Sequence, residues 1–263
     1  MKNLFSAACA LLAALAMPGA HAGGISDVGV NGYWGADGHN QGDVIGGSTY
    51  DISGATITRV GSVLTILIST NFAGHAGAFP SAGPNGIGYG DLFLSNVWNP
   101  FGADSHHTTD NASNGTLWKY GLSLDNRWSN TGGKFTLYNL TGATNAANVK
   151  NSETFMSCAL GTSCLYRDGQ AVAVKTTGTT GAVSTGLQGD WSITADQSIK
   201  FTFNMTGSDL INFTSFAMHW GETCQNDVIE GITKMVPEPG TIPLVMLGLG
   251  GLLLARRRQL FQR

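Results

Sequence analysis

Residues 56–69 read Thr56-Ile57-Thr58-Arg59-Val60-Gly61-Ser62-Val63-Leu64-Thr65-Ile66-Leu67-Ile68-Ser69, and they decide the fold class. After Gly61-Ser62 the apolar side chains Leu64, Ile66 and Ile68 recur at every second residue, and before it Ile57 lies between two threonines. This period of two is typical of β-strands with one buried face. Two such runs joined by a two-residue Gly-X turn are typical of a β-hairpin. We therefore expect two antiparallel strands, at 56–60 and 63–69.

The same period recurs later, and no segment shows a sustained helical period of 3.6 residues. Strands are expected at 118–124, 135–140, 191–194, 198–205 and 213–220. In the first of these, one face carries Trp118, Tyr120, Leu122 and Leu124. In the strand at 198–205, the inward-facing side chains are Ile199, Phe201, Phe203 and Met205. One helical turn is expected between Asn145 and Gly161. This pattern indicates an all-β domain, a jelly-roll-like two-sheet β-sandwich. A β-barrel or solenoid is the alternative, and the lack of a fixed repeat counts against the solenoid.

The N-terminus has the pattern of a secretory signal peptide, which we assign to residues 1–22. Lys2 precedes an apolar stretch from Leu4 to Met17, and Ala20 and Ala22 form a small-residue A-x-A site. This order predicts cleavage after Ala22, and an uncleaved N-terminal anchor is the alternative. We expect export through the inner membrane, with signal peptidase and the secretion machinery as partners.

The C-terminal tail, residues 236–263, combines three elements in order. Pro237-Glu238-Pro239 comes first, an uncharged apolar segment follows at 241–255, and the basic end 256–263 opens with Arg256, Arg257 and Arg258. The segment is shorter than the roughly 20 residues of a full bilayer span, but membrane thinning and snorkelling arginines reduce the deficit. We expect one transmembrane helix with its arginines in the cytoplasm. A buried core helix is the alternative, disfavoured by the glycines in the segment.

These residues resemble the PEP-CTERM sorting domain of Gram-negative bacteria. The likeness lies in Val236-Pro237-Glu238-Pro239, in the Leu/Gly-rich segment and in the arginine cluster. It implies that exosortase, a membrane transpeptidase-like enzyme, processes the chain near the Pro-Glu-Pro motif. It also implies transient anchoring in the inner membrane, a final place at the cell surface or outside the cell, and a link to exopolysaccharide and biofilm production.

The ectodomain between the two signals, residues 23–235, is acidic. It contains 9 Lys plus Arg and 16 Asp plus Glu, a formal charge of −7. A nucleic-acid-binding surface needs a basic face, so this balance excludes nucleic acid as an expected partner. Asp outnumbers Glu thirteen to three. Asp favours turns and oxygen-rich cation sites.

Three cysteines remain after signal removal, at positions 158, 164 and 224. An exported protein forms disulfides readily, and a Cys158–Cys164 bridge would close a small loop. Pairing of Cys224 with either of the others is the alternative. Cys224 also lies in residues 216–231, which resemble a terminal motif of PEP-CTERM ectodomains with an aromatic strand and a Cys-x-Asn-Asp turn. We expect Asn226 and Asp227 to end the strand by bonding nearby backbone.

Two groups of aspartates have the composition of a calcium site without a known calcium-loop spacing. One group is Asp37, Asp43 and Asp51 with Asn31 and Asn40, and the other is Asp91, Asp104 and Asp110 with Asn111. His106 and His107 lie within the second group and add a divalent-metal alternative. Ordinary turn aspartates are the competing interpretation of both groups. No cofactor other than calcium is expected.

The sequence contains no nucleophile elbow, zinc-binding helix motif or phosphate-binding glycine loop. A glycoside hydrolase would need two acids at a set distance, and Glu153, Glu222 and Glu230 have no supporting context. Sugar binding through exposed aromatic rings is an alternative, with Tyr33, Trp34, Trp98 and Trp128 as candidates. We therefore expect an exported, exosortase-processed surface or matrix protein with a non-catalytic role. A calcium- or carbohydrate-binding module and a secreted hydrolase are the alternatives.

Overall fold

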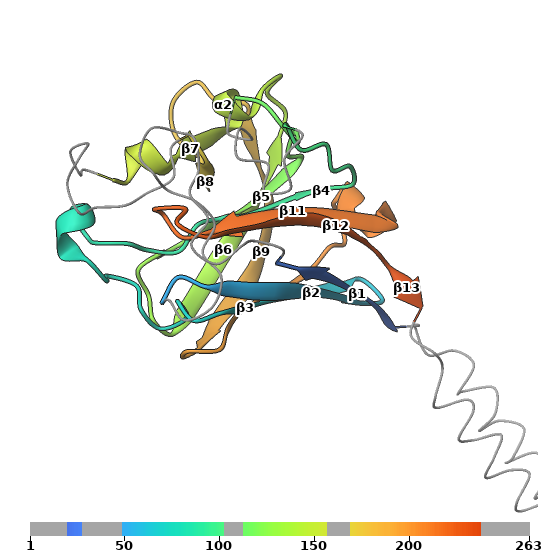
Figure 1. The fold of residues 1–263 in the computed structure, drawn as a ribbon. Coiled ribbons are helices and arrows are strands. Elements are labelled where there is room, and N and C mark those ends of the chain that lie inside the picture. Colours follow the sequence, from blue (N-terminus) through green and yellow to red (C-terminus); the bar gives the residue numbers. More distant parts are fainter. Residues whose placement is uncertain (1–19, 28–48, 103–112, 157–168, 238–263) are drawn as a thin grey trace, which may run out of the picture.

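A computed structural model describes residues 20–27, 49–102, 113–156 and 169–237 (Figure 1). Its strands are β1 (Ala20–Ser26), β2 (Ile52–Val60), β3 (Val63–Thr70), β4 (Leu92–Ser95), β5 (Tyr120–Leu124), β6 (Gly132–Leu140), β7 (Val149–Asn151), β8 (Ala171–Val174), β9 (Ala182–Thr194), β10 (Ser198–Asn204), β11 (Ser215–Gly221), β12 (Val228–Lys234) and β13 (Val236–Pro237). The helical elements are α2 (Asn145–Asn148) and three 3-10 turns, at Pro80–Ala82, Ser152–Thr154 and Asp209–Asn212. None of the helices in these ranges has the length and apolar character that a membrane crossing needs.

The strands form one large antiparallel sheet and one small sheet. The order in the eleven-stranded sheet is β12-β11-β4-β5-β6-β9-β10-β3-β2-β1-β13, and β7 pairs with β8 in the second sheet. The all-β prediction is confirmed. The predicted sandwich of two sheets is wrong in its connectivity, because one continuous sheet curls until it nearly closes into a barrel. The expected signal peptide up to residue 19 and the expected membrane segment lie outside the described residues.

The curl is located at the long strand β9. Its register with β6 shifts between Thr136 and Tyr138, and nearby Gly186 has a φ of 77°. Such a bulge bends a strand and increases the local twist of the sheet. β9 pairs with β6 on one edge and with β10 on the other. Because β9 bends, the sheet changes direction there without being divided into two separate sheets. The alternation of residues reveals strands but not this register shift.

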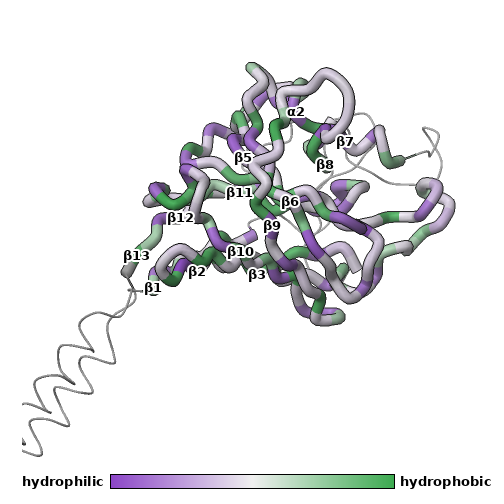
Figure 2. Tube along the Cα trace, turned by 180° about the vertical axis from the view of Figure 1, so that it is seen from behind, coloured by the Kyte–Doolittle hydropathy of each residue, from purple (hydrophilic) through white to green (hydrophobic). Residues whose placement is uncertain are grey.

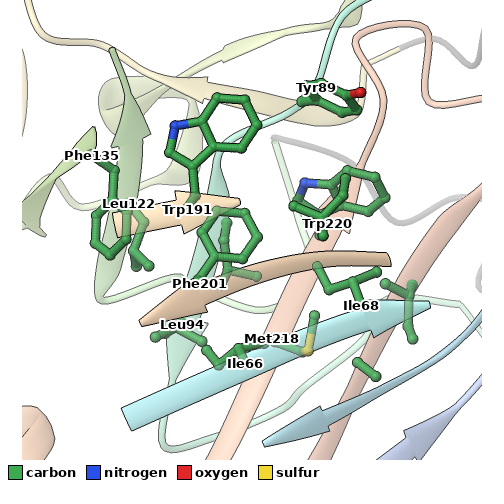
Figure 3. Close-up of a cluster of buried hydrophobic side chains, with 14 of the residues drawn as sticks. Ile66, Ile68, Tyr89, Leu94, Leu122, Phe135, Trp191, Phe201, Met218 and Trp220 are labelled. Carbon is green, nitrogen blue, oxygen red and sulfur yellow. The ribbon is translucent and has the colours of Figure 1, made fainter. Parts of the chain in front are cut away.

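The hairpin predicted at residues 56–69 is confirmed. β2 and β3 pair from Val60↔Val63 onward across the Gly61-Ser62 turn. β10 adds to β3 with Phe201 opposite Ile66 and Ile199 opposite Ile68, and all four side chains are fully buried. Figure 3 shows Phe201 and Ile66 in the same interior as Trp191 and Trp220. Alternate residues of each strand thus supply the main core, as the period of two predicts.

A second apolar cluster lies between the large sheet and the β7–β8 sheet. Its buried members are Phe93, Trp118, Leu140, Val149, Ala171, Val174 and Ala217. Trp118 was expected on the same face as the alternate residues of β5, and this expectation is wrong: Trp118 precedes the strand, whereas Tyr120 and Leu122 belong to the main core. Figure 2 shows hydrophobic segments on the strands of both sheets.

The predicted helical turn is confirmed as α2. Thr144 precedes it in extended conformation, and its hydroxyl accepts a hydrogen bond from the Ala147 N–H at 3.3 Å. Such a cap satisfies one of the free N–H groups at a helix start.

Asp125 stabilises the connection between β5 and β6 through hydrogen bonds to its carboxylate. Its carboxylate accepts the Asn126 N–H at 2.8 Å, the Lys134 N–H at 3.0 Å and the Trp191 indole N–H at 3.2 Å. Burial alone raises the pKa of Asp125, but the donors from Lys134, Trp191 and Asn126 outweigh it and lower the pKa. Hydrogen bonds to the charged form of a carboxyl produce this direction of shift.

We expect Asp125→Asn to remove a pH-dependent part of the stability. A carboxyl with a lowered folded-state pKa stabilises the fold above its unfolded pKa, about 3.9, and loses that contribution as the pH falls through its folded pKa. Urea unfolding of both proteins should therefore give a constant difference in unfolding free energy between pH 5 and 7. The difference should shrink below about pH 4, and a difference that persists at lower pH would contradict this assignment.

Candidate functional site

The two ends of the described chain meet in one strand pair. His21 pairs with Pro237 and Ala22 pairs with Val236, so β13 extends the sheet beyond β1. On its other edge β1 pairs with β2 along its whole length, from Ala20↔Val60 to Ser26↔Gly54. The start of β1 is therefore an inner strand, and β13 is the outermost one (Figure 1).

β1 also approaches β12 closely, where the sheet nearly closes. A Cβ atom on Gly23 would lie 2.2 Å from Thr233 Oγ1 and 2.8 Å from the Lys234 carbonyl oxygen. A Cβ atom on Gly231 would lie 2.8 Å from Ile25 Cγ2. Glycine is required at both positions because any larger residue would push the two strands apart.

The predicted sorting residues are thus only partly described. The structure brings Ala20 and Ala22, the predicted signal-cleavage residues, next to Pro237, the first residue of the Pro-Glu-Pro motif. Glu238, Pro239, the segment 241–255 and Arg256 to Arg258 lie outside the described residues. Sequence reasoning missed this proximity, because pairing between strands so far apart in the chain leaves no local pattern.

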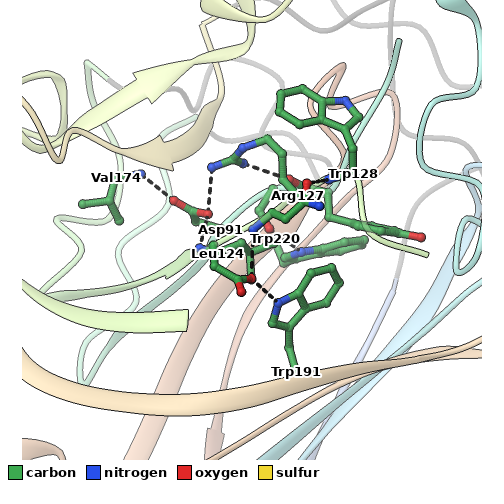
Figure 4. Close-up of polar contacts among 11 residues, drawn as sticks. Asp91, Leu124, Arg127, Trp128, Val174, Trp191 and Trp220 are labelled. Atoms are coloured by element: carbon green, nitrogen blue, oxygen red, sulfur yellow. Dashed lines mark hydrogen bonds and ion pairs between the residues drawn. The ribbon is translucent and has the colours of Figure 1, made fainter. Parts of the chain in front are cut away.

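Asp91 is held in a buried network of hydrogen bonds (Figure 4). Its Oδ1 accepts the Leu124 N–H and an Arg127 Nη2–H, each at 3.0 Å, and its Oδ2 accepts the Val174 N–H at 2.8 Å. Arg127 also donates to the Tyr89 carbonyl oxygen at 2.8 Å and lies 5.0 Å from the centre of the Phe155 ring. The guanidinium supplies the positive charge that compensates the buried carboxylate.

The described residues contain no group of three or more His, Cys, Asp or Glu side chains that could hold a metal ion. Asp91 is the described member of its predicted calcium group, and Asp104, Asp110, Asn111, His106 and His107 lie outside the described residues. In the other group Asp51 is buried, and Asp37, Asp43, Asn31 and Asn40 lie outside them as well. The calcium prediction for both groups stays a prediction.

His219 forms a second buried polar network. Its Nδ1 lies 2.9 Å from Glu230 Oε2, and its Nε2 lies 2.9 Å from the Ala171 carbonyl oxygen. The Trp98 indole N–H donates to Glu230 Oε1 at 2.8 Å. Each ring nitrogen thus lies within hydrogen-bond distance of an oxygen atom. The network joins β11, β12 and β8 beside the second apolar cluster.

The Cys-x-Asn-Asp segment forms the turn between β11 and β12. The expected bonds to nearby backbone are confirmed for Asp227, whereas the buried Oδ1 of Asn226 has no hydrogen-bond partner among the described residues. Asp227 accepts the Val228 N–H at 2.9 Å and the Ile52 N–H at 2.6 Å, so its carboxylate binds backbone of the turn and of β2. Cys224 is a buried free thiol. Burial first, and then the nearby carboxylates of Glu222 and Asp227, raise its pKa well above the ordinary value. A thiol with a raised pKa is a poor nucleophile. Cys158 and Cys164 lie outside the described residues, so their bridge stays a prediction.

Glu222 is buried near Tyr50. The pKa of the Tyr50 hydroxyl is raised, mainly by burial and further by its neighbours Cys224 and Glu222. Glu222 thus belongs to the end of the main core, whereas Glu230 bonds His219 in the second network and Glu153 accepts the Gly169 N–H at 2.8 Å. The three candidate acids have three separate sets of neighbours.

The candidate sugar-binding aromatics are partly placed. Trp98 and Trp128 are half-buried, and their indole N–H groups point to Glu230 and to the Gly86 carbonyl oxygen. Tyr33 and Trp34 lie outside the described residues.

An open groove of about 520 Å³ runs beside β4 and the start of β5. It is lined by Ser95, Val97, Asn99, Gly115, Thr116, Leu117, Trp118, Lys119, Leu140, Thr141, Gly142 and Ala143. Two aliphatic side chains on its wall are well exposed, Val97 at 56% and Leu117 at 48%. Hydroxyl and amide groups alternate with them. Lys119 adds one cationic side chain to these apolar and uncharged polar groups. Such a mixture suits a polar ligand.

Comparison with known proteins identifies the tail. The PEP-CTERM protein-sorting motif matches residues 236–259. No curated protein matches the chain, and no solved structure does. The chain is therefore a protein that carries a PEP-CTERM sorting motif, and the resemblance noted in the sequence is confirmed. The motif implies export, targeting to the cell surface and processing by exosortase.

We expect Asp91→Ala to lower the free energy of unfolding by about 3–5 kcal/mol, because it leaves Arg127 and two buried N–H groups without their acceptor. The matched control is Asp190→Ala, which breaks the exposed Lys134–Asp190 ion pair. That change should cost less than about 1 kcal/mol. Urea unfolding of the purified variants measures both, and equal costs would show that the Asp91 network does not stabilise the fold.

Proposed function

We propose that this chain is an exported surface protein whose tail is processed by exosortase and whose sheet domain has a non-catalytic role in an extracellular polysaccharide matrix. The observation that carries the proposal is the PEP-CTERM motif at residues 236–259. In this proposal signal peptidase cleaves after Ala22, residues 241–255 anchor the chain in the inner membrane, and exosortase acts at Pro237-Glu238-Pro239. The acidic sheet domain is then released or attached at the surface.

Three features of the domain support a non-catalytic role. Asp91 and Glu230 each bond a basic side chain, which suits a structural carboxylate better than a general acid or base. Hydrolysis of a glycosidic bond needs two carboxyl groups that converge on one cleft. The neighbours of Glu153, Glu222 and Glu230 differ, and the groove is lined by none of them.

Replacement of Pro237, Glu238 and Pro239 by alanine should block tail processing. The expected product is full-length protein in the inner membrane fraction, because the apolar segment and its arginines stay attached. Cell fractionation with mass spectrometry of the product measures this in a host that contains exosortase. Release of a shortened chain from the triple variant would overturn the sorting proposal.

Carbohydrate binding by the groove is a second candidate function. It is favoured by the exposed aliphatic side chains Val97 and Leu117 between hydroxyl and amide groups. The ectodomain has a formal charge of −7, so an acidic polysaccharide would be repelled unless calcium bridges the two. A neutral polysaccharide has no such penalty. Calcium binding by the aspartate groups remains part of this alternative.

The test is a pull-down of the purified protein on polysaccharide from the producing organism, with and without calcium. We expect saturable binding that Leu117→Asp weakens by about tenfold, because a charge on the groove wall must be desolvated on contact. Val60→Asp is the matched control: Val60 is 46% exposed on the β2–β3 hairpin, away from the groove, and binding should be unchanged. Equal effects of the two changes would exclude the groove as the site.

A further inference from the structure

The two predicted processing positions are neighbours in space. Signal-peptide cleavage is predicted directly after Ala22, and the sorting motif begins at Pro237. In the structure Ala22 pairs with Val236 and His21 pairs with Pro237. Among the described residues, both strand partners of β13 therefore belong to the segment that signal peptidase would remove.

This segment is held firmly in the uncleaved chain. Ala20, His21 and Ala22 pair on their other edge with β2, opposite Val60, Arg59 and Thr58. The first two residues of the sorting tail, Val236 and Pro237, thus pair with a strand that is itself held in the sheet. Enzymes and receptors that recognise a peptide backbone commonly do so on an extended segment with free backbone groups. In β13, part of these groups face β1.

Cleavage after Ala22 changes the two strands differently. Hydrolysis breaks the Ala22–Gly23 bond, and water supplies the hydroxyl of the new carboxyl group and the hydrogen of the new amino group. Gly23 to Ser26 stay paired with Ile57 to Gly54 of β2, so the rest of β1 remains in the sheet. β13 loses both of its partners. The sheet keeps its nearly closed form, while the tail after Met235 separates from β1.

We infer that removal of the signal peptide releases the sorting motif from the sheet, so that exosortase acts on chains whose N-terminus has already been cleaved. The inference rests on the proposed function, because it requires both processing steps. The inference adds that the folded domain couples signal-peptide cleavage to tail processing, because β13 pairs with residues upstream of the cleavage point. A chain with an uncleaved signal peptide is then a poor sorting substrate.

The test uses the full chain in a host that contains exosortase. In Ala20→Leu/Ala22→Leu the A-x-A site is lost, so the signal peptide stays attached, while both residues remain compatible with a β-strand. We expect tail processing to fall by about fivefold to tenfold, since the motif must first leave two residue pairs whose backbone bonds are worth roughly this factor. Intact mass of the cell-associated protein reports the state of both ends.

A rescue variant separates strand pairing from membrane tethering. A Gly-Ser linker of about six residues inserted after Met235 gives the motif reach beyond β1 even in the uncleaved chain. In the Ala20→Leu/Ala22→Leu background the insertion should restore processing, and in the natural background it should leave processing unchanged.

The outcomes are distinct. Full processing of the uncleaved chain without the insertion would overturn the inference, since docking on β1 would then not protect the motif. Loss of processing that the insertion does not restore would also overturn it, because the block would come from the tethered N-terminus. Absence of processing in the natural chain would instead refute the proposed function itself.

Discussion

The structure depends on the bend of β9. This strand pairs with β6 and β10, and a Cβ atom on Gly189 would lie 2.3 Å from the Phe135 ring and 2.6 Å from the Cβ atom of Phe203. The missing side chain lets aromatic groups from both neighbouring strands fill the interior at the bend. One sheet can therefore bury its own inner face, and β12 at one end comes close to β1 near the other end.

Two buried polar networks tie the small sheet to the large one. Asp91 receives an N–H from Val174 of β8, and His219 faces the Ala171 carbonyl oxygen at the other end of the same strand. A buried polar or charged group is costly unless it is hydrogen-bonded. Arg127 supplies the partner of Asp91, and Glu230 supplies the partner of His219. The networks therefore fix the position of β8 along the large sheet, because hydrogen bonds need particular partners and the apolar contacts of the second cluster do not.

The sequence predicts strands well and the long-range arrangement poorly, for physical reasons. The β2–β3 hairpin is encoded by a local turn and by alternation, so it was predicted with its register. The single curled sheet depends on a register shift between β6 and β9 and on the close approach of Phe135 and Phe203 to Gly189, which have no local pattern. Asp91 resembled a turn aspartate because its partner Arg127 and the Val174 N–H are distant in sequence. The sorting tail was identified because its signal is an ordered, local motif.

The position of the tail has a mechanical consequence. In a chain tethered through its C-terminal end, and with β13 freed by cleavage after Ala22, tension reaches Met235 and then Lys234, the last residue of β12. The Met235 N–H bonds the Thr214 carbonyl oxygen, and among the described strands β12 has β11 as its ladder partner, with Lys234 opposite Ser215. Tension that pulls this end away from the sheet loads those hydrogen bonds one after another, as in a zipper, rather than all at once. Drag on a tethered cell would therefore load the hydrogen bonds between β12 and β11 before those of the rest of the domain.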